Sequence, residues 1–342
     1  MACKRSGVQF PSAPPMTMVA VVMRTYERPV LLARAIASVQ QQTLSDWHLV
    51  IVNNGGDPAI VDNVVRIAQQ STTSSSGTIS VLHLDARVGM EEASNRGLAA
   101  TTSEFFVIHD DDDSWDERFL EVSVKAMGSH ESAAAVVTGI TRIHETFRGG
   151  SVWPVMHEDF YLTPGRLTLR GMIGNNTFPP IAALFRRRVI SQVGEFDASL
   201  PVLGDWEFNL RAVTTGEFVY IPEKLARYHT RTSESDSASG NSITIGEDLH
   251  RSVKLQLQDR WLQEPAVNGV NKGLLSMTAS TATDIEETQG GTRTRVDVEQ
   301  IANRTAQIIA LQSPLRRVVR GVLHPRHGVR AIVRRLRRII GK

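Results

Sequence analysis

Cysteine is nearly absent: Cys3 is the only one in 342 residues. A disulfide framework and a cysteine-built zinc site each need several cysteines, so both are excluded within one chain, and the composition fits a reducing compartment. Long apolar runs are missing too, because no stretch approaches the ~18 residues of a membrane-spanning helix and no signal peptide is visible. We therefore expect a cytoplasmic protein, either free or peripheral at the inner face of the cell membrane.

Acidic residues are absent from residues 314–342, which hold ten of the chain's 38 Lys and Arg residues. The remainder has 28 basic and 36 acidic residues, a net charge of −8. Apolar residues such as Val329, Ile332 and Leu336 share one helical face of this tail, and arginines share the other. A basic amphipathic helix of this kind binds anionic membrane surfaces. Packing on the body or on a partner is the alternative; no nucleic acid is expected, since no base-reading module accompanies the tail.

Periodicity is also absent from residues 1–17, which we expect to be disordered or a spurious extension. Residues 7–11 and 13–15 resemble translated transfer-RNA sequence, which would place the true start at Met16 or Met18. The remaining chain divides into a domain over 18–229, a linker with helices over 230–313, and the basic tail over 314–342.

From Val19 onward, apolar runs alternate with helical patterns. Strands are expected at 19–23, 48–52, 79–84 and 105–108, and the helices between them begin at Pro29 or cover 60–70 and 91–100. The second half predicts strands at 133–137, 181–185 and 218–221, and helices at 187–193, 206–214 and 249–262. Alternating strands and helices are typical of βαβ units. The expected class is α/β: a mixed, mostly parallel sheet flanked by helices, with a helical C-terminal extension.

Four adjacent carboxylates, Asp110 to Asp113, directly follow the strand at 105–108. Their mutual repulsion is relieved by a cation, and hard divalent ions prefer oxygen ligands. Alternate residues point the same way, so Asp110 and Asp112 could face one Mg²⁺ or Mn²⁺ ion. The alternative is a solvated acidic turn that caps a helix beginning near Trp115.

Four landmarks, in this order, resemble family 2 glycosyltransferases of the GT-A fold. They are the strand and Thr-Tyr-Glu-Arg-Pro turn of 19–29, the Ile-Val-Asn-Asn-Gly-Gly of 51–56, the Asn-Arg-Gly of 95–97 leading to Asp110-Asp111-Asp112, and the Gly-Glu-Phe-Asp of 194–197 followed by the Gly-Asp-Trp-Glu of 204–207. The resemblance covers 18–229, about three-fifths of the chain, which it implies is a GT-A nucleotide-sugar-binding domain.

The resemblance implies metal-dependent, inverting transfer from a nucleoside-diphosphate sugar to a hydroxyl of a glycan or lipid-linked acceptor, in cell-envelope or surface glycan synthesis. Asp205 would be the catalytic base, and the metal ligands would be Asp110, Asp112 and His229. The donor-binding residues would be Thr25, Tyr26, Arg28, Asn53, Asn95, Asp110 and Asp111.

Inversion needs one base that deprotonates the acceptor hydroxyl as it attacks, and a carboxylate at a helix start can do this. Asp205 is our candidate and Glu207 the second. Aspartate is also favoured as a helix N-cap, which is the alternative role of Asp205. For His229, a purely structural role is the alternative to metal binding.

Three positions depart from the family pattern. Asn53 stands where many relatives carry an aspartate that reads the base, which leaves the nucleotide open between UDP, dTDP and GDP. Ser94 replaces a frequent arginine, for which Arg96 or Arg87 could substitute. Gly204 replaces the usual glutamate before the base, which removes an acceptor contact.

Residues 149–180 are expected on the acceptor side, because they contain Trp153, His157, Glu158, Asp159, Tyr161, Asn175 and Asn176; a surface loop with a few packed aromatics is the alternative. A catalytically silent, membrane-surface protein that binds nucleotide sugars or glycans is the non-enzyme alternative. A phosphatase-type hydrolase also places Asp-any-Asp after a strand, but Ser114 stands where that motif has Thr or Val. A prenyl-transferase motif could be assembled from Asp112, Asp113 and Asp116, but that fold is all-helical.

Overall fold

The computed structural model describes residues 17–71, 77–148, 150–162, 164–231, 247–264 and 276. Of the expected N-terminal extension, only Thr17 falls within these ranges, and its hydroxyl lies 2.9 Å from that of Ser103. The expectations of a spurious extension, a polar linker beyond Ser276 and a basic amphipathic tail otherwise concern residues outside the described ranges.

The chain alternates strands and helices through its first half and mixes them thereafter. The strands are β1 (Val19–Thr25), β2 (Trp47–Asn53), β3 (Thr78–His83), β4 (Phe105–Asp110), β5 (Ser114–Trp115), β6 (Ala135–Arg148), β7 (Ser151–Phe160), β8 (Ala183–Arg186) and β9 (Phe218–Arg231). The helices are α1 (Pro29–Gln40), α2 (Pro58–Ser71), α3 (Met90–Ala99), α4 (Phe119–Ser129), α5 (Leu169–Met172), α6 (Arg188–Val193), α7 (Gly204–Ala212) and α9 (Glu247–Gln263), with short 3₁₀ turns η1 (Pro164–Leu167) and η2 (Pro180–Ala182).

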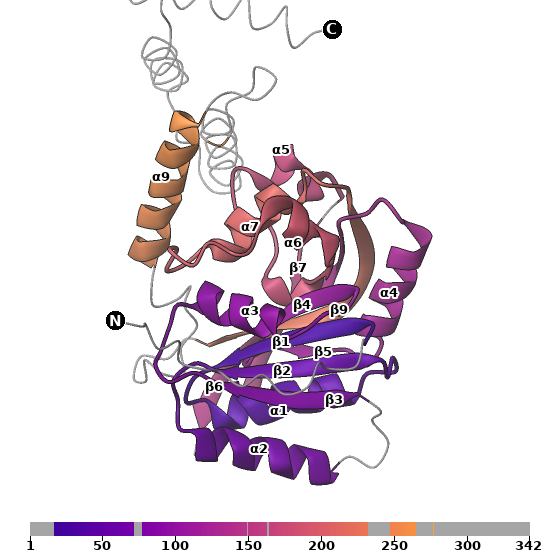
Figure 1. Ribbon diagram of the computed structural model, residues 1–342, viewed down its shortest axis with the longest axis vertical. Helices are drawn as coiled ribbons and strands as arrows, with labels where there is room; N and C mark the ends of the chain where they lie inside the picture. The colour runs from indigo at the N-terminus through magenta and orange to yellow at the C-terminus, as the bar shows by residue number, and fades with distance from the viewer. Residues whose placement is uncertain are drawn as a thin grey trace, which may run out of the picture. The chain divides into compact units, whose positions relative to one another are not determined.

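The first half forms the parallel part of the sheet, in the order β3-β2-β1-β4. Figure 1 shows α1 and α2 on one face of these strands and α3 on the other. Strands covered on both faces read as continuous apolar runs, and β2 is buried at every position. Because the strands run the same way, their carboxyl ends meet: Thr25 is in register with Asn53, and Arg24 with Asp110. The predicted βαβ organisation is confirmed here.

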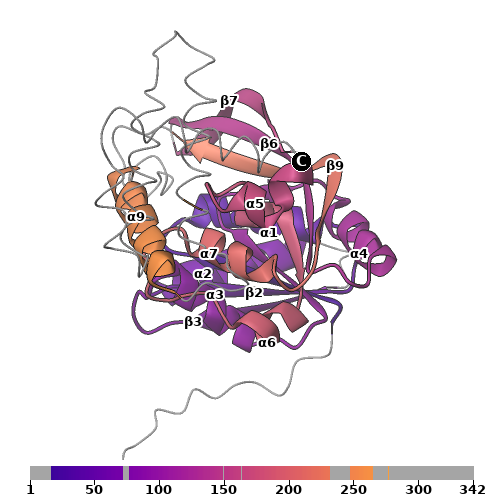
Figure 2. The same cartoon turned by 90° about the horizontal axis from the view of Figure 1, so that it is seen from above.

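The second half completes a mixed sheet. β8 pairs antiparallel with both β4 and β6, while β6 also pairs parallel with β9 and antiparallel with β7. Figure 2 shows β6, β7 and β9 side by side. The strand β5 pairs antiparallel with β9, which brings the end of the acidic run against Arg227. The predicted α/β class with a mixed sheet flanked by helices is therefore confirmed.

Three sequence-based expectations differ from the structure beyond β4: the lengths of two strands, the structure of residues 149–180, and the start of one helix. β6 and β9 each span 14 residues rather than the short runs expected. Within 149–180, where no strand was expected, β7 pairs with β6; it is mostly exposed, so it has no apolar pattern to detect. The helix after the acidic run begins at Phe119, not near Trp115, which lies in β5. An acidic turn that caps this helix is therefore not what the structure shows.

α9 packs on the same compact unit as the sheet, which extends to Ser276. The rings of Trp261 and Trp206 meet edge to face at 5.3 Å between centroids, and Arg260 forms an ion pair with Asp197 at 2.7 Å. Residues 247–264 thus cover α7, although the sequence placed them in a linker region.

Candidate active site

The acidic run at the end of β4 is surrounded by arginines. Arg24 of β1 forms an ion pair with Asp110, and Arg28 lies 3.3 Å from Asp111 and 3.5 Å from Asp112. Arg231, which is 1% exposed, forms an ion pair with Asp112. The repulsion expected from four adjacent carboxylates is therefore already offset in part by side chains of the chain itself.

Exposure separates the four carboxylates. The side chain of Asp110 is 28% exposed, whereas the other three aspartates are buried. Burial raises the pKa of Asp111 to about 7, against the opposing charge of Arg28, and burial also raises the pKa of Asp113. One oxygen each of Asp111 and Asp113 is buried with no hydrogen-bond partner among the described residues. Asp110 is thus the carboxylate best placed to meet a ligand.

His229 lies behind this run, in a network with Glu145 and Ser114. Its Nε2 is 2.8 Å from the Ser114 hydroxyl, its Nδ1 is 2.6 Å from Glu145 Oε1, and its backbone N–H donates to Asp113. Both ring nitrogens therefore have protein partners, so a metal bond would require His229 to give one of them up. This geometry favours the structural role over the expected metal ligand.

Glu145 gathers the cations of this network. Arg34 of α1 lies 2.5 Å from Glu145 Oε1, and Arg231 lies 3.2 Å from Oε2. Burial alone would raise the pKa of Glu145, but the His229 hydrogen bond and the charges of His229 and Arg34 outweigh it and lower the pKa to about 2. Glu145 is therefore ionised at neutral pH and fixes Arg231, which in turn holds Asp112.

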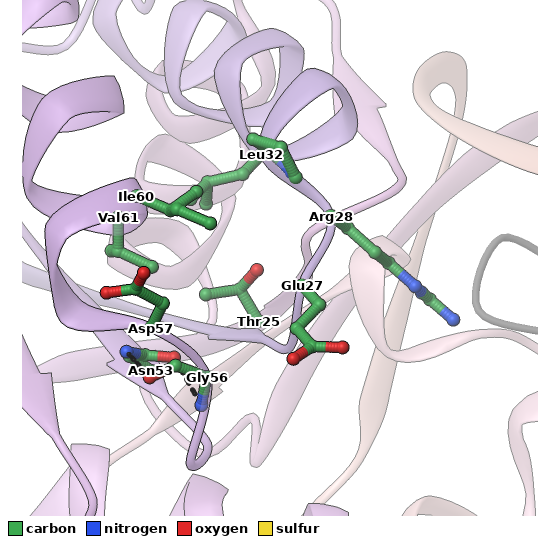
Figure 3. Close-up of a pocket in the computed structure, with 10 residues that line it drawn as sticks. Thr25, Glu27, Arg28, Leu32, Asn53, Gly56, Asp57, Ile60 and Val61 are labelled. Carbon is green, nitrogen blue, oxygen red and sulfur yellow. Dashed lines mark hydrogen bonds between the residues drawn. The ribbon is translucent and has the colours of Figure 1, made fainter. Parts of the chain in front are cut away.

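A pocket lies where β1 and β2 end and α1 and α2 begin. Its lining includes Thr25, Arg28 and Asn53, which the sequence assigned to donor binding, together with Glu27, Pro29, Leu32, Gly56, Asp57, Ile60 and Val61. Figure 3 shows the Arg28 side chain reaching away from Thr25 and Asn53. Because Arg28 also contacts Asp111 and Asp112, it connects this pocket to the acidic run.

The Asn53 amide shapes the turn that forms one wall of the pocket. Its Nδ2 donates to the Gly56 carbonyl at 2.8 Å, and its Oδ1 accepts from the Gly56 N–H at 3.0 Å. Nδ2 also lies 3.1 Å from Nδ1 of His83, whose Nε2 is 3.0 Å from Asp62. A His83 that donates to Asp62 accepts from Asn53, so both amide hydrogens of the buried Asn53 side chain are used within the protein.

Gly55, in the same turn, should not tolerate a side chain. It has φ +81°, and a Cβ there would lie 2.4 Å from the backbone nitrogen of Arg87. We expect Gly55→Ala to lower the free energy of unfolding by about 1–3 kcal/mol, through backbone strain and this clash, as measured by urea denaturation. Gly128→Ala in α4 is the matched control: nothing lies within 4 Å of its Cβ, so its stability should stay equal or rise. Equal effects of both substitutions would contradict the prediction.

Two other residues assigned to the donor have mainly structural contacts. The Asn95 amide donates to the Phe196 carbonyl at 2.9 Å and accepts from its N–H at 3.0 Å, so it fastens α3 to the segment before α7. Tyr26 has the Arg87 guanidinium 4.3 Å above its ring. Arg87, one of the two proposed substitutes for the missing arginine at Ser94, therefore reaches the β1 turn; Arg96 instead pairs with Glu92 on the surface.

Asp205 lies in the first turn of α7. The N-cap of that helix is Leu203, so the alternative role of Asp205 as the N-cap is not what the structure shows. Its Oδ2 accepts from the Asn176 amide at 2.7 Å. Burial raises the pKa of Asp205, the Asn176 hydrogen bond opposes this, and the charge of Asp110 raises it further. The start of α7 is linked to the acidic run by contacts, because the Glu91 side chain lies against Gly204 and shares Arg24 with Asp110.

Glu207, the second candidate for the base, is committed elsewhere. Its carboxylate forms an ion pair with Arg211 at 2.7 Å, and Arg211 also donates to the carbonyls of Val193 and Glu195. Glu207 thus ties α7 to the segment after α6. The geometry favours Asp205 as the carboxylate that faces the site.

The segment expected on the acceptor side is only partly brought to the site. Asn176 contacts Asp205, and Asn175 accepts from Lys254 of α9 at 2.5 Å. The others lie on or beside β7, where Trp153 is 56% exposed and Tyr161 86% exposed. Glu158 pairs with Arg142 and His144, and Asp159 pairs with Lys224.

Sequence reasoning gave no role to five charged residues of the site: Arg24, Arg34, Glu91, Glu145 and Arg231. Arg24 had a usable signal, because the end of the first strand lies opposite the end of its parallel neighbour, where Asp110 stands. The others come from helices or from the far ends of long strands, where a charged residue looks like ordinary surface. Nothing in their spacing places them beside the acidic run.

Among the described residues, no three or more His, Cys, Asp or Glu side chains form a ready-made metal cage. Within those same ranges, every helix is too short or too polar to cross a bilayer.

Comparison with known proteins gives a consistent result. The family model for glycosyl transferase family 2 matches residues 20–194, 175 of the chain's 342 residues. The chain is 25% identical over 228 residues to the uncharacterized glycosyltransferase YwdF of Bacillus subtilis, covering 67% of this chain and 78% of that protein. It is 25% identical over 230 residues to a PGL/p-HBAD biosynthesis glycosyltransferase of Mycobacterium tuberculosis, covering 67% and 80%.

Solved structures share the fold at lower identity. S. aureus TarS 1–349, solved in complex with UDP-GlcNAc, superimposes with a TM-score of 0.57 at 15% identity, over 85% of this chain and 80% of that one. The mannosyltransferase PcManGT of Pyrobaculum calidifontis, solved with GDP-Man and Mn²⁺, gives a TM-score of 0.53 at 15% identity, over 92% and 87%. The match to the family model spans the pocket, the acidic run and the strands that carry them, and the chain belongs to glycosyl transferase family 2.

Proposed function

We propose that this chain transfers a sugar, with inversion, from a nucleoside-diphosphate sugar to an acceptor hydroxyl, with Asp205 as the base. The observation that carries the proposal is a line of contacts between two parts of the chain: Asp110 and Glu91 share Arg24, and the Glu91 side chain lies against Gly204, the residue before Asp205. An inverting transfer needs these two things in one cleft: carboxylates where the diphosphate lies and a base on the opposite side of the sugar.

The nucleoside is assigned to the pocket lined by Thr25, Asn53 and Asp57. An amide oxygen such as that of Asn53 can accept from a base that presents a ring N–H, which uracil, thymine and guanine all do. UDP-, dTDP- and GDP-sugars therefore all remain candidates. Solved structures of the same fold hold UDP-GlcNAc in one case and GDP-Man in another, which supports a nucleotide-sugar donor. Tyr26 and Arg28 flank the pocket on the way to the acidic run.

The acidic run fits Mg²⁺ or Mn²⁺, because its donors are carboxylate oxygens. Mg²⁺ is usually held by one or two carboxylates together with substrate phosphates, rather than by an all-protein cage. Asp110, the exposed member, and Asp112 would hold the ion, and Asp111 would lie beside the donor. When bound, the ion would supply positive charge that stabilises the diphosphate leaving group. Mn²⁺ accompanies GDP-Man in PcManGT, which supports this assignment. His229 would join the ligands only by giving up Ser114 or Glu145.

Asp205 would accept the proton of the acceptor hydroxyl at its carboxylate. The Asn176 amide holds one carboxylate oxygen, which fixes the orientation of the other. Burial raises the pKa of Asp205 and makes its carboxylate a stronger base than an exposed aspartate. For the acceptor we propose a glycan or a lipid-linked molecule of the cell envelope, in line with the name of the mycobacterial relative. Docking on an anionic membrane surface would fall to the basic tail.

A thermal-shift screen of UDP-, dTDP- and GDP-sugars, each with and without Mn²⁺, tests the proposal. We expect one nucleotide class to raise the melting temperature by about 5 °C or more near 100 times its Kd, and only when Mn²⁺ is present. The free nucleosides serve as controls for binding without the diphosphate. Donor binding without any sugar transfer or donor hydrolysis would instead support a catalytically silent binding protein. Stabilisation by none of the donors would contradict the proposal.

A further inference from the structure

Gly204, immediately before the proposed base, lies against the carboxylate of another helix. A Cβ at Gly204 would lie 2.3 Å from Oε1 of Glu91, and 2.4 and 2.5 Å from its Cγ and Cδ. All three nearest atoms belong to the Glu91 side chain, so this side chain fills the space that any other residue at 204 would need. The space beside the first turn of α7 is thus occupied by a carboxylate of α3.

Glu91 has two specific partners in that position. Its Oε2 lies 3.3 Å from Nη1 of Arg24, and its side chain packs against Gly204. Its side chain is 5% exposed, so these partners replace water around a buried carboxylate. Burial raises the pKa of Glu91 to about 7, and the charge of Arg24 opposes this. Burying an unpaired ionised carboxylate here would destabilise the fold, and the ion pair with Arg24 offsets that effect for Glu91.

Arg24 carries the connection onward to the acidic run. Its guanidinium binds Glu91 through Nη1 and Asp110 through Nη2, and its side chain is 11% exposed. One cation therefore lies between a carboxylate of the proposed donor site and a carboxylate that holds the start of α7. The series of contacts that begins at Asp110 and passes through Arg24 and Glu91 therefore ends at Gly204, one residue before Asp205.

We infer that Glu91 is a positioning residue, which orients Arg24 at the donor site and holds the first turn of α7, and with it Asp205, in place for transfer. The inference rests on the proposed function. Because Glu91 gives Arg24 a second carboxylate, Asp110 can exchange Arg24 for the donor and its cation without leaving a buried guanidinium unpaired. A purely structural salt bridge between α3 and β1 would not need the contact with Gly204.

A stability cycle tests the contact independently of activity. Gly204→Ala should lower the melting temperature by several degrees when Glu91 is present, because the new methyl overlaps the carboxylate. In a Glu91→Ala background the same change should be neutral or stabilising, since alanine is the better helix former. The change in melting temperature caused by Gly204→Ala should therefore differ between the two backgrounds, whereas independent sites would give the same change in both. Equal effects in both backgrounds would overturn the inference.

Kinetics test the role. The nearly isosteric Glu91→Gln variant should lower kcat by about tenfold to 100-fold, as expected when a catalytic group is misplaced, while the KM for the donor changes less. Glu91→Ala should behave likewise, and Glu91→Ala/Gly204→Glu, which moves the carboxylate to α7, should recover part of the loss. Wild-type kcat in Glu91→Gln, or a folded double variant with no gain over Glu91→Ala, would overturn the inference.

Glu92→Gln is the matched control, because Glu92 is the next residue on α3 and pairs only with Arg96 at the surface among the described contacts. It should keep wild-type kcat and melting temperature, since exposed pairs contribute about 0–1 kcal/mol. If the wild-type chain transfers no sugar from any donor, the proposed function fails. The stability cycle would still show whether Glu91 and Gly204 are in contact, so the two failures are distinguishable.

Discussion

Asp205→Asn should bind the donor as the wild type does, yet lose about 10²–10⁴-fold in kcat, the range that general-base catalysis typically contributes. Asparagine keeps the size of the side chain and an oxygen that can accept the Asn176 hydrogen bond. It cannot take a proton from the acceptor hydroxyl. Single-turnover transfer at saturating donor measures the loss, and the thermal shift produced by the donor measures binding.

The pH profile gives the same residue a second signature. Burial raises the pKa of Asp205 above the ordinary aspartate value, so its carboxylate takes up a proton at a higher pH than an exposed aspartate does. The base works only when ionised. The kcat of the wild type should therefore fall as the pH drops through this raised pKa, and the residual activity of Asp205→Asn should lack that limb.

Two variants separate a lost base from a disturbed fold. Asp46→Asn changes an exposed aspartate in the loop before β2 and should leave transfer and stability unchanged. Glu207→Gln weakens the buried pair with Arg211 and should lower the melting temperature more than it lowers kcat. Full activity in Asp205→Asn, together with loss of transfer in a stable Glu207→Gln, would assign the base to Glu207 instead.

The first half of the fold was predictable because its strands are buried on both faces of the sheet. The strands β1, β2 and β4 lie between helices, so they appear as uninterrupted apolar runs, and the helices between them show one apolar face. The position of the acidic run follows from the same pattern. Residues at the carboxyl ends of neighbouring parallel strands must meet, which is why the sequence alone places Thr25, Asn53 and Asp110 at one edge of the sheet.

The distal halves of β6 and β9 could not be predicted in this way. They bury charge instead of apolar surface: Glu145 and His229 pair across the two strands, and Arg231 closes the cluster. A buried ion pair has no sequence periodicity, and the partners here are more than 80 residues apart. Glu91 could not be recognised for the same reason, because nothing in the sequence distinguishes its buried ion pair from the surface pair of its neighbour Glu92. Only the fold distinguishes the two glutamates.

Asp110→Asn should remove the metal dependence of donor binding and lower kcat/KM by at least about 100-fold, which corresponds to about 2.7 kcal/mol of lost transition-state stabilisation. Asp110 is the most exposed carboxylate of the four, so it is the one that a donor-bound cation can reach. The amide oxygen can still accept from the charged Arg24, so the ion pair becomes a hydrogen bond to a neutral acceptor and the fold should persist. Titration of the donor at fixed Mn²⁺, and of Mn²⁺ at fixed donor, measures the effect.

Variants of two neighbouring aspartates serve as comparisons for Asp110→Asn. Asp116→Asn, on the other side of β5, affects only the half-exposed pair with Arg227 and a contact with Arg118, so it should match the wild type. Asp112→Asn removes charge from the buried pair with Arg231, so it should lower the melting temperature as well as donor binding. Asp110 differs from both, because its effect should appear in metal-dependent binding while stability stays constant. If donor binding by Asp110→Asn still requires Mn²⁺, the ion is held elsewhere. The acidic run would then have a structural role, in which its carboxylates pair with the surrounding arginines.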